Sequence, residues 1–260
     1  MFNKLLELYK YKELIKTLVG RDLKARYRNS VLGYAWTWLE PLMMMLVFIL
    51  IFDVLLKSGV KHFPLYLLCG LIPWTFFSNT ISTSVGSITS NAGLIKRVYY
   101  PREIFPLTTT LTHGVNMFLS CMVLIPVVLA FGLPITAKML LFPVITVFLI
   151  FFAFGLGLLL ATLNVFMRDI MYMVPLIIRV WFFATPIFYT VENRVPEKLL
   201  DIYMILNPIA VMISLFRYAF MNYNAPKPVH IAFAFAVCML MFLVGYGFFK
   251  KNEDLMVKRI

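Results

Sequence analysis

The chain has 260 residues, of which 62% are hydrophobic and 14% charged, and its formal net charge is +12. A soluble domain is typically about 45–50% apolar and about 25% charged. One buried core cannot absorb this excess, so the composition excludes an ordinary soluble domain and predicts a polytopic membrane protein. Lys and Arg lie between apolar blocks rather than on one face, which favours contact with a membrane surface over nucleic acid binding.

Six continuously apolar segments dominate the chain, and each approaches the roughly 20 residues that a helix needs to cross a bilayer. They lack the ten-residue alternation of membrane β-strands, so we expect an all-α protein. The predicted spans are residues 33–56, 64–88, 104–131, 139–163, 170–190 and 230–249. The chain, 1–260, is then a single transmembrane domain, made of an N-terminal segment (1–32), a six-span region (33–249) and a tail (250–260).

The distribution of positive charge predicts the orientation of these spans. Sixteen of the 24 Lys and Arg residues fall on one side of the membrane if both termini lie on that side. Cytoplasmic loops carry the excess of Lys and Arg in membrane proteins. We therefore expect a multi-pass protein of the cytoplasmic membrane with both termini inside, and Arg217 is counted among the few charges of the outer loops.

The first segment, residues 3–28, has the pattern of an amphipathic helix. Its apolar residues fall near one helical face and its lysines largely elsewhere: Leu5, Leu8, Ile15, Leu18 and Val19 against Lys4, Lys12 and Lys16. This pattern predicts a helix that lies on the cytoplasmic leaflet, with a solvated helix packed on a partner as the alternative. Four cations precede span one: Arg21, Lys24, Arg26 and Arg28. They either keep this segment on the cytoplasmic side, as positive charges do, or attract an anionic lipid head group.

Span one begins with aromatic residues and contains a carboxylate. Tyr34 and Trp36 sit where an aromatic belt is expected, so they are either interface anchors or substrate contacts. Glu40 shares a helical face with Trp36 near the inner end of the span, and Asp53 lies near the outer end. Charges inside a span are costly and usually face a cavity or a partner, so either carboxylate is a candidate partner for a buried cation.

The segment between spans two and three, "NAGLIKRVYYPREIFP" (Asn91–Pro106), is short, basic and aromatic. Asn91 is a suitable N-cap and Pro101 a suitable stop, which predicts a short helix over Ala92–Tyr100. The basic residues of this loop place it on the cytoplasmic side.

Arg179 lies near the middle of span five, where an isolated charge indicates a cavity or a partner. Tyr172, Phe182 and Phe183 fall near its helical face. A cationic stripe lined with aromatic rings suits an anionic or sugar-bearing substrate, because Arg pairs with phosphate and flat rings stack on sugars. The alternative is a structural Arg that is satisfied by backbone carbonyls or by a carboxylate.

Other parts of the chain indicate packing rather than chemistry. No G-x-x-x-x-G-K-[ST] motif occurs, so we expect no nucleotide site in this chain. The histidines and cysteines show no metal-ligand spacing, and no catalytic grouping is recognisable. Gly155 and Gly157 lie in mid-span, where a row of small residues favours close helix packing. Residues 191–229 contain apolar runs too short to span on either side of Asn207-Pro208, which predicts re-entrant or interface-lying helices.

Four ordered blocks of sequence resemble ABC-2 type permeases that export polysaccharides. The blocks are "RDLKARYRNSVLGYAWTWLEPL" (Arg21–Leu42), "NAGLIKRVYYPREIFP" (Asn91–Pro106), "LNVFMRDI" (Leu163–Ile170) and "LNPIAVMISLFRYAF" (Leu206–Phe220). The resemblance is greatest to Wzm-type O-antigen exporters, with capsule and teichoic-acid exporters close behind. It implies a transport subunit in the cell inner membrane that exports a lipid-linked polysaccharide. An ABC-2 permease for another glycan, a lipid or a drug is the alternative, and a membrane-embedded glycan-transferring enzyme has less support.

The resemblance also implies partners and site residues. Two copies would form a homodimer around a pore, and two separate ATPase subunits would bind ATP and Mg. Spans one, two and five line the route in this family, which places the following near the pore: Tyr34, Trp36, Glu40, Tyr172, Arg179, Phe182 and Phe183. The loop after span two would hold a helix that docks on the ATPase, through Leu94, Ile95, Lys96, Arg97, Val98, Tyr99, Tyr100 and Arg102. The lipid head group would approach along Arg21, Lys24, Arg26 and Arg28.

Overall fold

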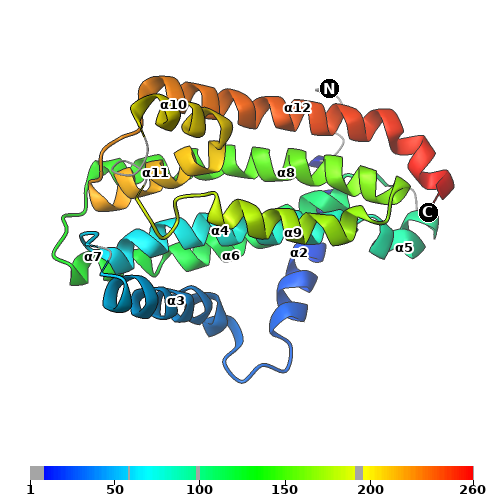
Figure 1. The fold of residues 1–260 in the computed structure, drawn as a ribbon. Helices are drawn as coiled ribbons and strands as arrows, with labels where there is room; N and C mark the ends of the chain where they lie inside the picture. The colour runs from blue at the N-terminus through cyan, green and yellow to red at the C-terminus, as the bar shows by residue number, and fades with distance from the viewer. Residues whose placement is uncertain (1–8, 58, 98–99, 191–195, 260) are drawn as a thin grey trace.

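The computed structural model describes residues 9–57, 59–97, 100–190 and 196–259, and within them every regular element is helical. The longer helices run side by side in one elongated bundle (Figure 1). Their bounds are α2 (Lys12–Tyr27), α3 (Trp36–Phe48), α4 (Phe63–Gly86), α5 (Ala92–Arg97), α6 (Ile104–Cys121), α7 (Leu124–Ala130), α8 (Phe142–Phe166), α9 (Ile170–Phe183), α10 (Glu197–Leu206), α11 (Pro208–Met221) and α12 (Pro228–Arg259). Short 3-10 or π turns extend α3, α4 and α8. The all-α prediction is confirmed.

Five of the predicted spans are confirmed as helices of sufficient length and apolarity among the described residues. They cover Gly33–Leu55, Phe63–Gly86, Ile104–Ala130, Ala137–Phe166 and Pro228–Arg259. The last of these continues through the predicted tail, so residues 250–259 are helical rather than a separate terminal segment. Figure 1 places α5 and the C-terminus at one end of the bundle, and α7, α10 and α11 at the other. We call these the α5 end and the α11 end.

The predicted fifth span, 170–190, is wrong in length, because α9 has only 14 residues and ends at Phe183. Pro186 explains the break, since a proline disfavours helical backbone at the residue before it. The next two helices, α10 and α11, meet at an angle of 98° around Asn207, which is the form of a broken span or a re-entrant loop. This arrangement confirms the short helices expected between 191 and 229.

The broken pair is fastened to the end of α9 by buried polar groups. The Asn207 side chain accepts from the Ala210 amide as the cap of α11, and its Nδ2 donates to the Thr185 hydroxyl at 3.1 Å. Arg217 of α11 is 3% exposed; its Nη2 donates to the Ile187 carbonyl at 2.9 Å, and its guanidinium lies 3.4 Å from the centroid of the Tyr66 ring. Arg217, counted from the sequence among the charges of the outer loops, therefore lies within a helix with its guanidinium buried.

The centre of the bundle is α4, which is 78% buried over its most apolar stretch. It packs against α3, α6, α8, α9 and α11. Its aromatic side chains join the neighbours into one core: the Phe77 ring stacks on Phe152 of α8 at 5.6 Å and meets the edge of Trp181 of α9 at 5.3 Å. A helix whose side chains are mostly apolar and face other helices is expected to be buried in this way.

The closest helix pair is α8 with α12, and glycines make this contact possible. A Cβ added to Gly155 would lie 2.5 Å from the Cα of Phe242, and one added to Gly245 would overlap the Gly155 carbonyl. Gly157 points to α4 instead, where an added Cβ would lie 3.0 Å from Ser84. The packing role expected for Gly155 and Gly157 is confirmed, with each glycine facing a different helix.

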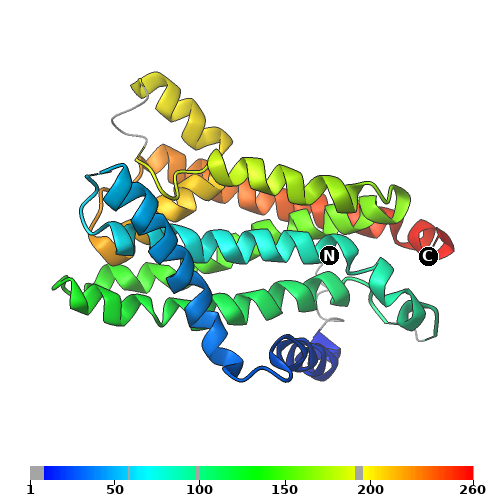
Figure 2. The same ribbon diagram turned by 60° about the horizontal axis from the view of Figure 1, so that its bottom comes forward.

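The N-terminal helices α2 and α3 form a V against one side of the bundle, and Figure 2 shows α3 crossing the other helices at an angle. Two residues of the connecting turn, Asn29 and Gly33, have φ of 59° and 49°, which allows the sharp reversal. Three hydrogen bonds attach the V to α6, and they are Tyr27 Oη to Asn116 Oδ1, Trp38 Nε1 to the Leu119 carbonyl, and Ser120 Oγ to the Thr37 carbonyl. The amphipathic helix of 3–28 is helical where described, and Leu5 and Leu8 lie outside the described residues.

Candidate functional site

The face that α4 and α9 share carries two clefts in line with one another. Along α4, the residues that line them recur every three or four positions, so they occupy one helical face: Leu71, Thr75, Ser78, Ser82 and Gly86. On α9 the lining positions form two groups, seven residues apart and therefore on the same helical face: Met171 and Tyr172, then Ile178, Arg179, Phe182 and Phe183. We call the surface formed by both clefts the α4–α9 groove.

The cleft nearer the α11 end has a volume of about 460 Å³ and an aromatic wall. The Trp74 and Phe182 rings meet edge to face at 5.6 Å, and Phe183 is 65% exposed beside them. Polar groups complete the lining: Glu40, Thr75, Ser78, Asn79 and Arg179. Exposed ring faces offer stacking surfaces, and the adjacent cation, amide and carboxylate offer hydrogen bonds. We call it the aromatic cleft.

The second cleft, nearer the α5 end, has a volume of about 670 Å³ and is rich in hydroxyl groups. We call it the hydroxyl cleft, and its lining residues are Ser82, Thr83, Gly86, Thr89, Ser90, Asn164, Arg168, Met171 and Tyr172. The hydroxyls of Thr83, Thr89 and Ser90 donate to backbone carbonyls of their own segment. Since their protons are used in this way, the Thr89 and Ser90 oxygens present acceptor lone pairs to the cleft, whereas the Thr83 oxygen also contacts Nε2 of His113 at 3.0 Å. This surface suits a ligand with many O–H donors.

The structure brings together four of the seven predicted pore residues in the aromatic cleft, which are Glu40, Arg179, Phe182 and Phe183. Tyr172 lies further along the same groove, in the hydroxyl cleft. Tyr34 and Trp36 line neither cleft, and the Tyr34 ring contacts Tyr27 at 4.8 Å instead. The pore prediction for these two residues is therefore not supported by their position.

The suggested pairing of Arg179 with a carboxylate of span one is also wrong. Glu40 lines the same cleft as Arg179, but its Oε2 lies 3.5 Å from Nη2 of Arg26. Asp53 is exposed in the π-helical turn Ile49–Leu55 that follows α3. Arg179 is exposed in the groove and keeps its donors accessible to a ligand.

The resemblance placed span two on the route, but sequence reasoning named no residue of α4 at this site. Trp74 and Ser78 both line the aromatic cleft, yet neither drew attention in a long apolar segment. A signal was present, because the polar residues Thr75, Ser78, Asn79 and Ser82 follow helical spacing along one face of α4. A polar stripe in a span indicates a surface that faces water or a partner rather than lipid.

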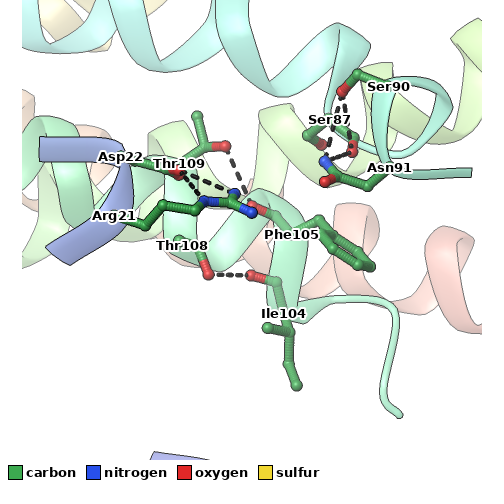
Figure 3. A network of polar contacts seen from close by, with 9 residues as sticks. All are labelled: Arg21, Asp22, Ser87, Ser90, Asn91, Ile104, Phe105, Thr108 and Thr109. Carbon is green, nitrogen blue, oxygen red and sulfur yellow. Dashed lines mark hydrogen bonds and ion pairs between the residues drawn. The ribbon is translucent and has the colours of Figure 1, made fainter. Parts of the chain in front are cut away.

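The cations of α2 are divided between two surfaces. Arg21, Lys24 and Arg28 line one open basic surface along the helix, together with Lys16. Arg21 also pairs with Asp22 at 2.9 Å, and Figure 3 shows this pair beside Thr109 near the start of α6. Arg26 lies apart from them and pairs with Glu40. Three of the four predicted head-group cations therefore share a surface, and Arg26 does not.

The predicted docking segment forms α5, but its residues are placed differently from the expectation. The Asn91 amide nitrogen donates to the Ser87 carbonyl at 2.8 Å, so Asn91 caps the end of α4 rather than the start of α5 (Figure 3). Leu94 is 41% exposed and Lys96 is exposed. Ile95 is 8% exposed and belongs to an internal core, so it is not an anchor for a partner.

The remaining residues of that segment are only partly described. Val98, Tyr99 and the side chain of Arg97 lie outside the described part of the structure. Tyr100 packs at 6.1 Å from Phe105 of α6. Arg102 forms an ion pair with Glu253 of α12 at 3.2 Å. Of the residues predicted to dock on a partner, only Leu94 and Lys96 are both described and exposed on the surface.

Comparison with known proteins agrees with this architecture. The family model for the ABC-2 type transporter matches residues 13–221. The chain is 31% identical over 248 residues to the O-antigen export system permease protein RfbA of Myxococcus xanthus, covering 95% of each chain. It is 31% identical over 240 residues to a protein of the same name from Klebsiella pneumoniae, covering 92% of each. It is 23% identical to the polysialic acid transport protein KpsM of Escherichia coli, over 95% of this chain and 96% of that protein. A family match over most of the chain, from α2 to the end of α11, means that this chain belongs to the ABC-2 type transporter family.

Proposed function

We propose that this chain is the membrane subunit of an ATP-driven exporter that moves a lipid-linked, O-antigen-like polysaccharide across the cytoplasmic membrane. The observation that carries the proposal is the α4–α9 groove, in which an aromatic wall is followed by a surface of hydroxyl acceptors. The names of the relatives support the same substrate class.

The groove suits a chain of sugars because its contacts are weak and repeated. From Met171 to Phe183 the lining of α9 covers 12 residue steps, which is about 18 Å at 1.5 Å per helical residue. Sugar rings would stack on the exposed Phe183, which Trp74 and Phe182 back from inside, and sugar hydroxyls would donate to the Thr and Ser oxygens. Each contact has a close neighbour along the path, so a glycan can slide from one to the next without a deep energy minimum.

A second copy of the chain would close the groove into a pore. Arg179, Thr75 and Ser78 open onto the same cleft as Phe183, an apolar residue of α9 that is 65% exposed. A charged residue facing lipid at mid-span costs about 2.5–3.5 kcal/mol even on insertion scales, so this face belongs against water or protein. We infer a homodimer in which two copies of the groove enclose an aqueous path.

The two ends of the bundle then take different roles. We place the α5 end and both termini in the cytoplasm, with two ATPase subunits docked on α5 around Leu94 and Lys96. ATP and Mg would bind to those subunits, and this chain would contribute no nucleotide site. The basic surface of α2, with Arg21, Lys24 and Arg28, would attract the lipid diphosphate. The α10–α11 pair would border the outer exit.

A single substitution in the groove tests the proposal. The chain is co-expressed with its ATPase in a strain that lacks the native exporter, and surface glycan and co-purified ATPase are both measured. Loss of one hydrogen bond to a charged group costs about 1.5–3 kcal/mol of substrate binding free energy. Arg179→Ala should therefore lower export about 10-fold or more, with the complex still assembled.

The matched control is Lys251→Ala, which removes an exposed cation outside the groove. Unchanged surface glycan in Arg179→Ala would contradict a substrate role for the groove. Loss of assembly would mean that Arg179 is structural. If no ATPase co-purifies with the unsubstituted chain, the transport proposal itself is lost.

A further inference from the structure

An ion cluster at the α5 end joins two segments that are far apart in the sequence. Nζ of Lys250 lies 2.8 Å from the carboxylate of Glu103 and 3.0 Å from that of Glu253. Arg102 contacts the other oxygen of Glu253 at 3.2 Å. Glu103 directly precedes α6, whereas Lys250 and Glu253 lie on α12. We call these four residues the α5-end clamp.

Apolar packing beside the clamp connects the same segments. A second core, separate from that of the main bundle, contains Ile95 of α5, Phe105 of α6, and Phe249 and Met256 of α12. Phe249 and Met256 are fully buried. The docking helix α5, the start of α6 and the end of α12 are therefore packed into one unit.

Stability alone gives a poor reason for the clamp. The Glu103 side chain is 1% exposed, and a buried carboxylate loses hydration that its ion pair restores only when the geometry is good. Apolar residues of similar volume are often as stable at such a position. A buried ionic network does, however, fix one relative arrangement of the segments that it joins. Because the clamp lies next to α5, the arrangement that it fixes is that of α5 relative to α12.

The backbone contact between α12 and α8 extends the unit along the bundle. At Gly155 and Gly245 the two helices touch without intervening side chains, so neither can slide past the other without a clash. A displacement of the end of α12 is therefore shared by α8. The chain leaves α8 at Phe166 and reaches α9, which lines the groove, after three residues.

We propose that Glu103 and Lys250 are positioning residues for transport, which hold the loop carrying α5 on α12 so that force delivered at α5 moves α12 and α8 as one body. This inference rests on the proposed docking of an ATPase at α5. It adds a second path for the force besides the direct connection of α5 to α4. Without the clamp, α5 would move with the ATPase while α12 stayed behind.

Spin-label distances in the complete complex test this directly. The native cysteines, Cys69, Cys121 and Cys238, are buried, so labels would react at introduced ones. Gly93→Cys with Lys251→Cys places one label on α5 and one on α12, both at exposed positions. We expect this distance to be the same without nucleotide and with ATP trapped by vanadate. The pair Gly93→Cys with Met43→Cys, which compares α5 with an exposed position of α3 outside the joined unit, should change. A change in the first pair, or no change in either, would overturn the proposal.

A charge-neutral double variant tests the function of the clamp. Glu103→Gln with Lys250→Met removes both charges at once, so neither is left buried without its partner. We expect the ATPase to co-purify and hydrolyse ATP as before, while glycan exported per ATP falls about fivefold or more, within the usual range of coupling between sites. The matched control is Lys251→Met with Asp254→Asn, which makes the same charge changes at exposed positions of α12.

The readouts separate the possible outcomes. Normal export by the clamp variant overturns the inference, and so does loss of ATPase binding, because the residues would then belong to the docking surface. If the unsubstituted chain binds no ATPase, the proposed function fails instead. If the clamp variant does not fold, the label distances measured in the chain that keeps Glu103 and Lys250 still test whether α5 and α12 move together.

Discussion

The contact between α8 and α12 predicts a large effect from one added methyl group. In Gly155→Ala the new Cβ would lie 2.5 Å from the Cα of Phe242 and 2.6 Å from the Met241 carbonyl oxygen. Both neighbours are backbone atoms, so no side-chain rotation relieves the clash and the helices must separate. Overpacking of this kind costs typically 1–3 kcal/mol, and a rigid backbone neighbour places the effect near the upper value. A loss of about 3 kcal/mol lowers the folding equilibrium constant more than 100-fold.

Gly247→Ala provides the matched control, because Gly247 lies on α12, is exposed, and has no atom within 4 Å of an added Cβ. Replacing an unconstrained helical glycine by alanine stabilises by roughly 0.5–1 kcal/mol. The assay is reversible unfolding of the detergent-solubilised chain in increasing dodecyl sulfate, followed by helical circular dichroism. We expect the two variants to shift the midpoint in opposite directions. Equal stability of Gly155→Ala and the unsubstituted chain would refute the tight crossing.

Three further variants test other parts of the structure. Lys96→Glu together with Arg97→Glu should reduce ATPase co-purification about tenfold or more, as loss of two complementary charges would; undiminished binding would remove α5 from the docking surface. Arg217→Leu leaves the Ile187 carbonyl buried without its donor, which costs about 1–3 kcal/mol, and we expect a lower unfolding midpoint in the same assay. Asn207→Ala removes the cap of α11 and should cost about 0.5–2 kcal/mol; an unchanged midpoint would show that the cap is dispensable.

The long apolar helices could be predicted from sequence because burial in a bilayer requires a continuous apolar run, which is visible in the letters. The length of α9 could not be predicted in this way, since the residues after Phe183 are also largely apolar. The break depends on Pro186 and on buried partners from α11. The burial of Arg217 could not be predicted for a related reason: its donors are satisfied by backbone carbonyls and the Tyr66 ring, which only the fold brings together.

The candidate site was only half visible in the sequence. Arg179 stood out because an isolated charge in a span is rare. Trp74 did not, because an aromatic residue in an apolar helix gives no sign of which neighbour it faces. Ile95 and Leu94 are adjacent and equally apolar, yet one enters the internal core and the other faces outward. That difference is set by the rotation of α5 on α12, which no short-range pattern encodes.

The shortness of α9 has a consequence for the membrane around it. Fourteen residues rise about 21 Å, whereas the hydrocarbon core of a bilayer is about 30 Å thick. A mismatch of about 9 Å must be met by thinning of the lipid or by water reaching inward from the α11 end. Either response shortens the apolar barrier beside the groove. The hydrated chain that this groove suits would then cross a dry barrier only about two thirds as thick as the surrounding bilayer.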